Sequence, residues 1–349
     1  EPLLAHYKNN PDACQPESAR NEVVSFLEGG VSDLSISRST FDWGIPVPWD
    51  TDQVVYVWFD ALLNYATAVG LTDAPDSEGG KKFAQTWPAD VHLVGKDILR
   101  FHAVIWPAML MAAGLAVPKK VFAHGWLLVG GEKMSKSKLT GIAPKDITDH
   151  FGIDAFRYYF LRAIPFGTDG SFSWEDMSAR YTSELANDFG NLASRLAAMI
   201  EKYCDGLLPQ VAHDKTLEEA LSKTVSKADE AMCALDFQGG INAIMDFCKR
   251  VNGYVTEKEP WILAKDPANK VVLEEVLYNT AESLRALAVL LNSVMPTTCE
   301  ILWQSLGAQD ALGTLSSQKI SSVATWGQLP AGARVTKTPV LFPRLESAE

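Results

Sequence analysis

Short apolar runs alternate with longer helical patterns between residues 50 and 145. The apolar runs are typical of buried strands, and the stretches between them have helical spacing. An order of strand, helix, strand, helix, strand predicts βαβ units and a parallel sheet, in which ligands bind beyond the carboxyl ends of the strands. The predicted strands are 54–59, 91–94 and 121–124, and the predicted helices are 60–69 and 98–113.

The strand pattern stops near residue 145, and apolar residues then recur at helical spacing. Prolines and glycines separate the helical stretches, which is typical of a bundle with short connections. The fold class is therefore α/β followed by all-α. Helices are predicted at 154–161, 174–203, 217–235, 240–256 and 271–294, with a helix at 16–27 and short strands at 34–38 and 335–342.

The composition limits the class of protein. The chain has 349 residues, of which 47% are hydrophobic and 21% charged, as in a packed protein of two or three domains. It contains no run of eighteen apolar residues, no signal-peptide pattern and no CxxC pair among its five cysteines. We therefore expect a cytoplasmic protein with no membrane contact, no metal ligands and no zinc site in this segment. The net charge of −12 means that any RNA contact must use local patches.

A loop rich in glycine, lysine and serine follows the last predicted strand. Lys133 and Lys136 lie three residues apart and can reach the same polyphosphate as point charges. The hydroxyls of Ser135 and Ser137 can orient the loop or contact phosphate. Two lysines at this spacing alone would favour a solvated basic turn. The complete string of residues 133–137, directly after a predicted strand, favours a phosphate-binding loop.

The string Lys133-Met134-Ser135-Lys136-Ser137 resembles the KMSKS signature of class I aminoacyl-tRNA synthetases. The flanking sequence resembles the methionyl family of that class over essentially the whole chain. The resemblance implies a Rossmann-type catalytic domain, a helical anticodon-binding bundle, and the use of ATP and Mg²⁺. It also implies activation of L-methionine to methionyl-adenylate and transfer to the 3′ end of tRNA(Met). In the family the loop stabilises the transition state at the α-phosphate, so Lys133 and Lys136 are the candidate catalytic residues, and Met134, Ser135 and Ser137 are candidate ATP contacts.

Two segments, 57–65 and 94–102, resemble the walls of the methionine pocket in that family. Methionine has a polarizable sulfur that gains from aromatic contact, which Trp58 and Tyr65 can supply. His102 or the Tyr65 hydroxyl can also hydrogen-bond the thioether, a weak acceptor. The candidate methionine-binding residues are Trp58, Ala61, Leu62, Tyr65, Ile98 and His102, with Leu62 standing where the family often has proline.

The resemblance implies further ATP contacts at strand ends. Gly95 and Asp97 stand where the family contacts the ribose, and a carboxylate suits ribose hydroxyls. Asp97 can also cap the following helix. Trp126 and Leu127 are expected to approach the adenine.

A polar face crosses the predicted helix 174–203. Asn187, Asn191 and Arg195 recur every four residues and therefore line one side of it. Amide and guanidinium groups can read unpaired bases, and Trp261 after Pro260 can stack on one. A solvated helix face and a buried tryptophan are the alternative. The methionyl family has anticodon contacts at matching positions, so the resemblance favours recognition of the CAU anticodon.

The first signature of the class, His-Ile-Gly-His or a variant, is absent from the sequence. We therefore expect an N-terminal segment of the same enzyme to complete the catalytic sheet, and we expect this chain alone to be inactive. The predicted domains are the tail of an inserted connective-peptide domain (1–30), the second half of the catalytic domain (31–130), the KMSKS loop with a stem-contact linker (131–170) and the anticodon-binding domain (171–349).

Two alternatives stay open. One is a relative that charges leucine, isoleucine or valine, which Trp58 with His102 disfavours because those substrates offer no hydrogen-bond acceptor. The other is a noncatalytic tRNA-binding module, which an intact phosphate loop beside intact pocket residues disfavours.

Overall fold

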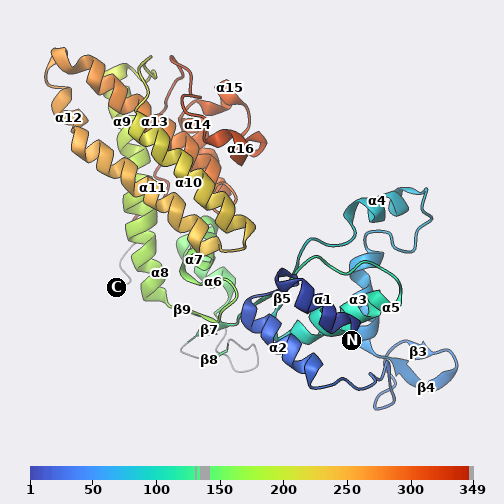
Figure 1. Cartoon of the computed structure of the whole chain (residues 1–349). Coiled ribbons are helices and arrows are strands. Elements are labelled where there is room, and N and C mark those ends of the chain that lie inside the picture. Colours follow the sequence, from blue (N-terminus) through green and yellow to red (C-terminus); the bar gives the residue numbers. More distant parts are fainter. Residues whose placement is uncertain (130–131, 134–141, 346–349) are drawn as a thin grey trace. The chain divides into compact units, whose positions relative to one another are not determined.

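The computed structural model describes residues 1–129, 132–133 and 142–345 (Figure 1). The chain divides into two compact units. Unit 1 comprises Glu1–Trp126 with Gly167–Asp169, and unit 2 comprises Leu127–Phe166 with Gly170–Glu349. Among the helices of the described residues, none combines the length and the apolar character needed to cross a membrane.

Unit 1 is organised around a three-stranded parallel sheet. Its central strand β6 (Val121–His124) lies between β1 (Cys14–Gln15) and β5 (His92–Gly95). In register, Cys14 and His92 both lie opposite Val121, on the two sides of β6. The predicted parallel sheet and its strands β5 and β6 are confirmed, whereas β1 comes from a segment for which no strand was predicted.

The predicted strand 54–59 is wrong in its second half. Strand β4 (Asp50–Val55) ends early, and helix α3 (Val57–Thr67) begins at once, so Trp58 lies in the first turn of a helix. Strand β4 also pairs antiparallel with β2 (Ser37–Arg38) and β3 (Pro46–Val47) in a separate small sheet. The prediction failed because a short apolar run of six residues does not distinguish a strand from the start of a buried helix.

The predicted helix 98–113 is present but irregular. It consists of a 3-10 turn (Lys96–Ile98), a π-helix (Phe101–Ile105) and α5 (Trp106–Ala112). Together these elements connect β5 to β6. The remaining helices of unit 1 are α1 (Pro2–Asn9), α2 (Glu17–Glu28) and α4 (Glu78–Thr86), with a 3-10 turn at Pro11–Ala13.

Unit 2 begins with a small sheet and continues as a helical bundle. Strand β7 (Leu127–Val129) pairs antiparallel with β8 (Glu132–Lys133) and parallel with β9 (Gly170–Phe172). The five helices predicted after residue 150 are confirmed, and the prediction 174–203 corresponds to one continuous run of α8, a π-helix and α9. The helices are α6 (Pro144–Phe151), α7 (Ile153–Ala163), α8 (Trp174–Arg180), the π-helix (Tyr181–Gly190), α9 (Asn191–Cys204), α10 (Lys215–Cys233), α11 (Phe237–Lys258), α12 (Pro260–Leu263), α13 (Lys270–Leu291), α14 (Pro296–Ser305), α15 (Ala308–Leu312) and α16 (Ile320–Val323), with 3-10 turns at Pro267–Asn269 and Leu315–Ser317.

Helix α13 forms the centre of the bundle. It packs against α9, α10, α11 and α14, and beyond its exposed first turn apolar side chains on all its faces are buried, as expected of a central helix. It also buries an ion pair between Glu282 and Arg285, whose Nε lies 2.8 Å from Glu282 Oε1.

The predicted strand 335–342 is absent. Within the described residues this segment forms no strand, and the isolated bridge between Leu207 and Arg334 lies just before it. The Val335 N–H donates to the Gly206 carbonyl, and Phe342 is buried against the bundle. The alternation of apolar and polar residues suggested a strand, but it arises because only some side chains of this segment pack on the helical bundle.

Candidate functional site

Aromatic rings from α3 and from the π-helix after β5 meet in unit 1. The Trp58 ring stacks on Phe101 with centroids 4.1 Å apart, and its edge faces His102 at 6.1 Å. Tyr65, two turns further along α3, lies 5.6 Å from His102 by ring centroids. The structure therefore brings together Trp58, Tyr65 and His102, three of the predicted methionine-binding residues.

Hydrogen bonds fix the protonation of His102. Its Nδ1 lies 3.0 Å from the Ile98 carbonyl, which can only accept, so Nδ1 carries a proton. Burial lowers the pKa of His102, although the bond to Ile98 opposes this effect, and the ring is neutral. Nε2 is then an acceptor, and the Tyr65 hydroxyl, 2.9 Å away, donates to it. A thioether would have to compete with His102 for the Tyr65 proton, so the predicted bond to the sulfur requires a local rearrangement and stays a prediction.

A second histidine extends this network. The indole N–H of Trp106 donates to His92 Nε2 at 3.3 Å, and the His92 and Tyr65 rings are 4.5 Å apart. Burial, with a smaller contribution from His102, lowers the pKa of His92 to about 4. Both histidines are therefore neutral near pH 7, and the described part of this ring cluster presents aromatic surface without a cation.

The other predicted pocket residues differ in their exposure. Leu62 is fully buried and packs with Ala66, Trp106 and Leu110, so it supports the aromatic residues from behind. Ala61 and Ile98 are half-buried. Their contact with a ligand stays a prediction.

The carboxyl end of β5 leads into a polar cluster. Gly95 ends the strand, and the Asp97 carboxylate folds back so closely that a Cβ on Gly95 would meet Asp97 Oδ1 at 2.6 Å. Between them, Lys96 places its ammonium 2.7 Å from Asp169 Oδ2 and 4.1 Å from the centroid of the Trp126 ring. Two of the predicted ATP contacts, Gly95 and Asp97, thus lie at a strand end, and another, Trp126, contacts the lysine between them.

Asp169 anchors this cluster, and sequence reasoning missed it. Its Oδ1 accepts the Trp126 backbone N–H at 2.8 Å, and the bond from Lys96 holds the pKa of its carboxyl below the ordinary value. Gly125 allows the segment that carries Asp169 to lie this close to Trp126, because a Cβ at position 125 would be 2.1 Å from the Thr168 carbonyl oxygen. Since Asp169 is 73 residues from Lys96 in sequence, no local pattern could have revealed it.

The predicted phosphate loop is only partly described. Lys133 ends strand β8 in unit 2, and its side chain lies outside the described part of the structure, as do Met134, Ser135, Lys136 and Ser137 entirely. Leu127 begins β7 and packs against the core of unit 2. Among the described residues, no group of three or more His, Cys, Asp or Glu side chains could hold a metal ion.

The predicted RNA-binding residues come together on unit 2. The Arg195 guanidinium lies over the Trp261 ring, 5.4 Å from its centroid. Pro260 begins the short helix α12, and Trp261 follows it with 36% of its surface exposed. Asn187 and Asn191 are exposed on the π-helix and the start of α9.

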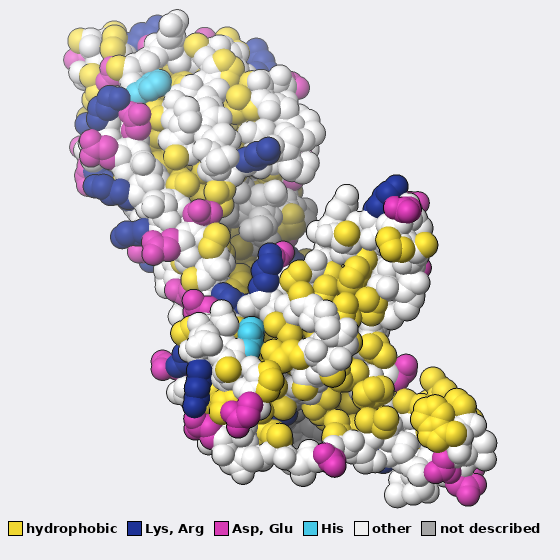
Figure 2. Space-filling view, turned by 45° about the vertical axis from the view of Figure 1, so that its right-hand side comes forward, with side chains coloured by type: hydrophobic (Ala, Val, Ile, Leu, Met, Phe, Trp, Pro, Cys, Tyr) yellow, Lys and Arg dark blue, Asp and Glu magenta, His cyan; other side chains and the backbone are white. Residues whose placement is uncertain are grey.

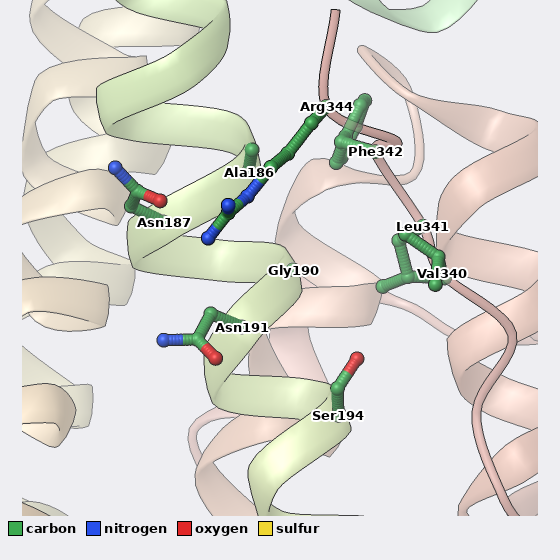
Figure 3. A pocket seen from close by; sticks show the side chains of 9 residues that line it. All are labelled: Ala186, Asn187, Gly190, Asn191, Ser194, Val340, Leu341, Phe342 and Arg344. Carbon is green, nitrogen blue, oxygen red and sulfur yellow. The ribbon is translucent and has the colours of Figure 1, made fainter.

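Asn187 and Asn191 line a pocket of about 220 Å³, together with part of the C-terminal segment (Figure 3). Its other lining residues are Ala186, Gly190, Ser194, Val340, Leu341, Phe342 and Arg344. No local sequence pattern indicates this second wall, because it lies about 150 residues further along the chain.

Two family models match the chain. The model described as "tRNA synthetases class I (M)" matches residues 1–197, and the model described as "Anticodon-binding domain of tRNA ligase" matches residues 214–337.

Individual relatives agree with these models. The chain is 65% identical to the methionine–tRNA ligase of Streptomyces coelicolor, over 99% of the chain and 65% of that protein. It is 48% identical to the methionine–tRNA ligase of Caldanaerobacter subterraneus and 45% identical to that of Bacillus subtilis, each time over 99% of the chain and about half of the relative (53% and 52%). The chain thus spans less than two thirds of the length of these relatives.

Solved structures give the same result. Mycobacterium tuberculosis methionyl-tRNA synthetase bound by methionyl-adenylate superposes with a TM-score of 0.87 at 40% identity, over 98% of this chain and 66% of that one. Its apo form superposes with a TM-score of 0.88 at 38% identity, over 99% of this chain and 67% of that one.

Proposed function

This chain belongs to the class I tRNA synthetases (M), and on that premise we propose that it supplies the methionine pocket and the anticodon-binding domain of a methionine–tRNA ligase. The enzyme would activate L-methionine with ATP to methionyl-adenylate and transfer the methionyl group to the 3′ end of tRNA(Met). The observation that carries the proposal is the ring cluster of Trp58, Tyr65 and His102, in a chain that resembles methionine–tRNA ligases along its length.

The ring cluster suits a methionine side chain. Contact between a thioether sulfur and an aromatic ring is worth roughly 0.3 to 1.5 kcal/mol. Because His92 and His102 are neutral, the cluster does not repel an apolar substrate by presenting buried charge. Leucine or isoleucine would lose the sulfur contacts, which supports methionine as the substrate.

ATP recognition is proposed for the cluster at the end of β5. The Asp97 carboxylate can accept the ribose hydroxyls beside Gly95, and the Trp126 backbone, held by Asp169, offers a fixed segment for the adenine. Lys133 and Lys136 would stabilise negative charge that builds on the transferring phosphate, assisted by Met134, Ser135 and Ser137. Mg²⁺ would neutralise phosphate charge, and we assign no residue of this chain to it.

Anticodon recognition is proposed for the Asn187–Arg195 face with Trp261. Amides can pair with the edges of unpaired bases, and an exposed indole beside Arg195 can stack on a base. This arrangement explains how a chain of net charge −12 can bind RNA through specific contacts.

We also propose that an N-terminal segment of the same enzyme completes the catalytic sheet. Figure 2 shows hydrophobic side chains gathered over much of unit 1. The exposed apolar side chains of unit 1 include Leu93, 54% exposed on the edge strand β5, and Trp43 and Trp49, which are exposed near β3 and β4. Apolar surface beside an unpaired sheet edge supports a further covering segment. The 349-residue chain alone should then show no methionine-dependent ATP–pyrophosphate exchange.

Two tryptophan variants of the complete gene product test the proposal. Trp58→Ala should raise the KM for methionine in pyrophosphate exchange, whereas Trp261→Ala should weaken tRNA charging and leave that exchange nearly unchanged. Equal loss of both activities in both variants would mean that the tryptophans are structural, and the assignment of separate pockets would fail.

A further inference from the structure

We propose that His92 is a positioning residue for methionine recognition, because it holds the plane of the Tyr65 ring on which selection of a sulfur-containing side chain depends. The inference rests on the proposed function, which supplies the substrate. It concerns a residue outside the set of predicted methionine contacts, and it assigns His92 an effect on the substrate through Tyr65 alone.

Strand β5 fixes the backbone of His92. The residue begins this strand, and its backbone N–H donates to the Lys120 carbonyl at 2.9 Å. It lies opposite Val121 of the central strand β6, and it is only 6% exposed. The imidazole therefore projects from a paired strand that cannot shift without disturbing the parallel sheet.

Trp106 fixes the orientation of the imidazole. Its indole N–H donates to His92 Nε2 at 3.3 Å, and Trp106 is fully buried where helix α5 begins. The Trp106 ring in turn meets the Trp87 ring edge-on, with centroids 5.9 Å apart. The His92 ring is thus held at its backbone and at its far nitrogen, so it offers Tyr65 a rigid surface.

The Tyr65 ring needs such a surface. Its hydroxyl donates to His102 Nε2 at 2.9 Å, which fixes the tip of the side chain. A single bond at the tip still lets the ring turn about its long axis, because the second side-chain torsion of tyrosine has a broad preference. The ring also borders a cavity of about 360 Å³, which leaves room for such a turn. His92 lines the same cavity and lies against the Tyr65 ring with centroids 4.5 Å apart, so it opposes the turn.

The plane of the Tyr65 ring matters for a thioether. Sulfur gains most from an aromatic ring at about 5 Å, often at the ring edge, so the gain depends on how the ring faces it. Norleucine has the shape of methionine with a methylene in place of the sulfur, and it therefore gains little from this contact. Release of the Tyr65 ring should weaken methionine binding more than norleucine binding. His92 then contributes to selectivity more than to binding in general.

The test is ATP–pyrophosphate exchange by the complete gene product with methionine and with norleucine. His92→Leu removes the ring that faces Tyr65 and should raise the KM for methionine about three- to tenfold. The kcat and the KM for ATP should stay nearly unchanged, and the methionine-to-norleucine ratio of kcat/KM should fall. His92→Gln keeps an acceptor for the Trp106 N–H but also lacks the ring, so it should show the same fall. The matched control is His213→Leu, which removes a histidine stacked on Tyr278 in unit 2 and should keep the parent values.

The outcomes separate this inference from the proposed function. If the parent protein shows no methionine-dependent exchange, both fail. If Trp58→Ala raises the KM for methionine while both His92 variants keep the parent ratio, the function stands and the role of His92 is wrong. Full selectivity in His92→Gln would also overturn it, since the bond to Trp106 would then matter instead of the ring. Equal losses of kcat with both amino acids would show that His92 is only structural.

Discussion

Replacing Glu282 by glutamine should destabilise unit 2 severely. The Glu282 and Arg285 side chains are 0% and 1% exposed, and Arg285 Nε donates to Glu282 Oε1 at 2.8 Å. The same oxygen accepts the backbone N–H groups of Gly327 and Gln328, and Oε2 accepts that of Leu329, all between 3.0 and 3.1 Å. The carboxylate therefore fixes the return segment after α16 to the central helix α13.

The cost follows from these contacts. A glutamine can keep its carbonyl toward the three donors at Oε1, but its amide nitrogen then faces the Leu329 N–H and leaves that donor unsatisfied. A buried unsatisfied group costs about 1 to 3 kcal/mol. The Arg285 charge also loses its only carboxylate partner among the described residues and keeps only neutral acceptors, which are the glutamine carbonyl and the carbonyls of Val323 and Thr325. Breaking a buried pair in this way costs about 3 to 5 kcal/mol, and that loss dominates the expected change.

Urea unfolding followed by circular dichroism at 222 nm measures the change, because unit 2 contains most of the helix. The matched control is Glu257→Gln, which removes the same charge from an exposed pair in which the Arg250 and Glu257 side chains are 39% and 61% exposed. The control should cost about 0.5 kcal/mol or less. A cost below about 1 kcal/mol for Glu282→Gln, with an unchanged slope m, would refute the reasoning about the buried pair.

Two further predictions concern the sites. His92, whose pKa is about 4 in the fold and about 6.5 when unfolded, takes up a proton on unfolding at acidic pH. The contribution of neutral His92 to the free energy of unfolding should therefore be fully present above pH 6.5. At pH 5 the free energy of unfolding should be lower by about 1 to 2 kcal/mol. Urea titrations at both pH values should show a smaller fall for His92→Gln. In the complete enzyme, Asp169→Ala should raise the KM for ATP several-fold in pyrophosphate exchange through loss of its bonds to Lys96 and Trp126, with the KM for methionine little changed. An equal rise in both KM values would contradict this assignment.

The long helices and the strands β5 and β6 could be predicted from the sequence because their apolar patterns are sustained or bounded by clear breaks. The run 54–59 could not be assigned, since its last three residues start α3, where burial comes from rings on the π-helix after β5. The prediction of a strand at 335–342 was wrong for a similar reason. Its alternation of apolar and polar residues comes from contact with a helical bundle, without a partner strand among the described residues.

The candidate site residues also differ in whether the sequence could reveal them. Trp58, Tyr65 and His102 were predicted because two segments resemble a known pocket, and the three rings lie together in the structure, although their contact with a ligand stays a prediction. Asp169 was missed because it contacts residues far away in the sequence, and only tertiary packing brings it there.

Pyrophosphate exchange with each amino acid tests the central claim most directly. The complete gene product should exchange ATP and pyrophosphate with methionine, far more weakly with leucine, isoleucine or valine, and Trp58→Ala should raise the KM for methionine. Exchange that depends on leucine or isoleucine but not on methionine would contradict the account, whatever the RNA-binding results.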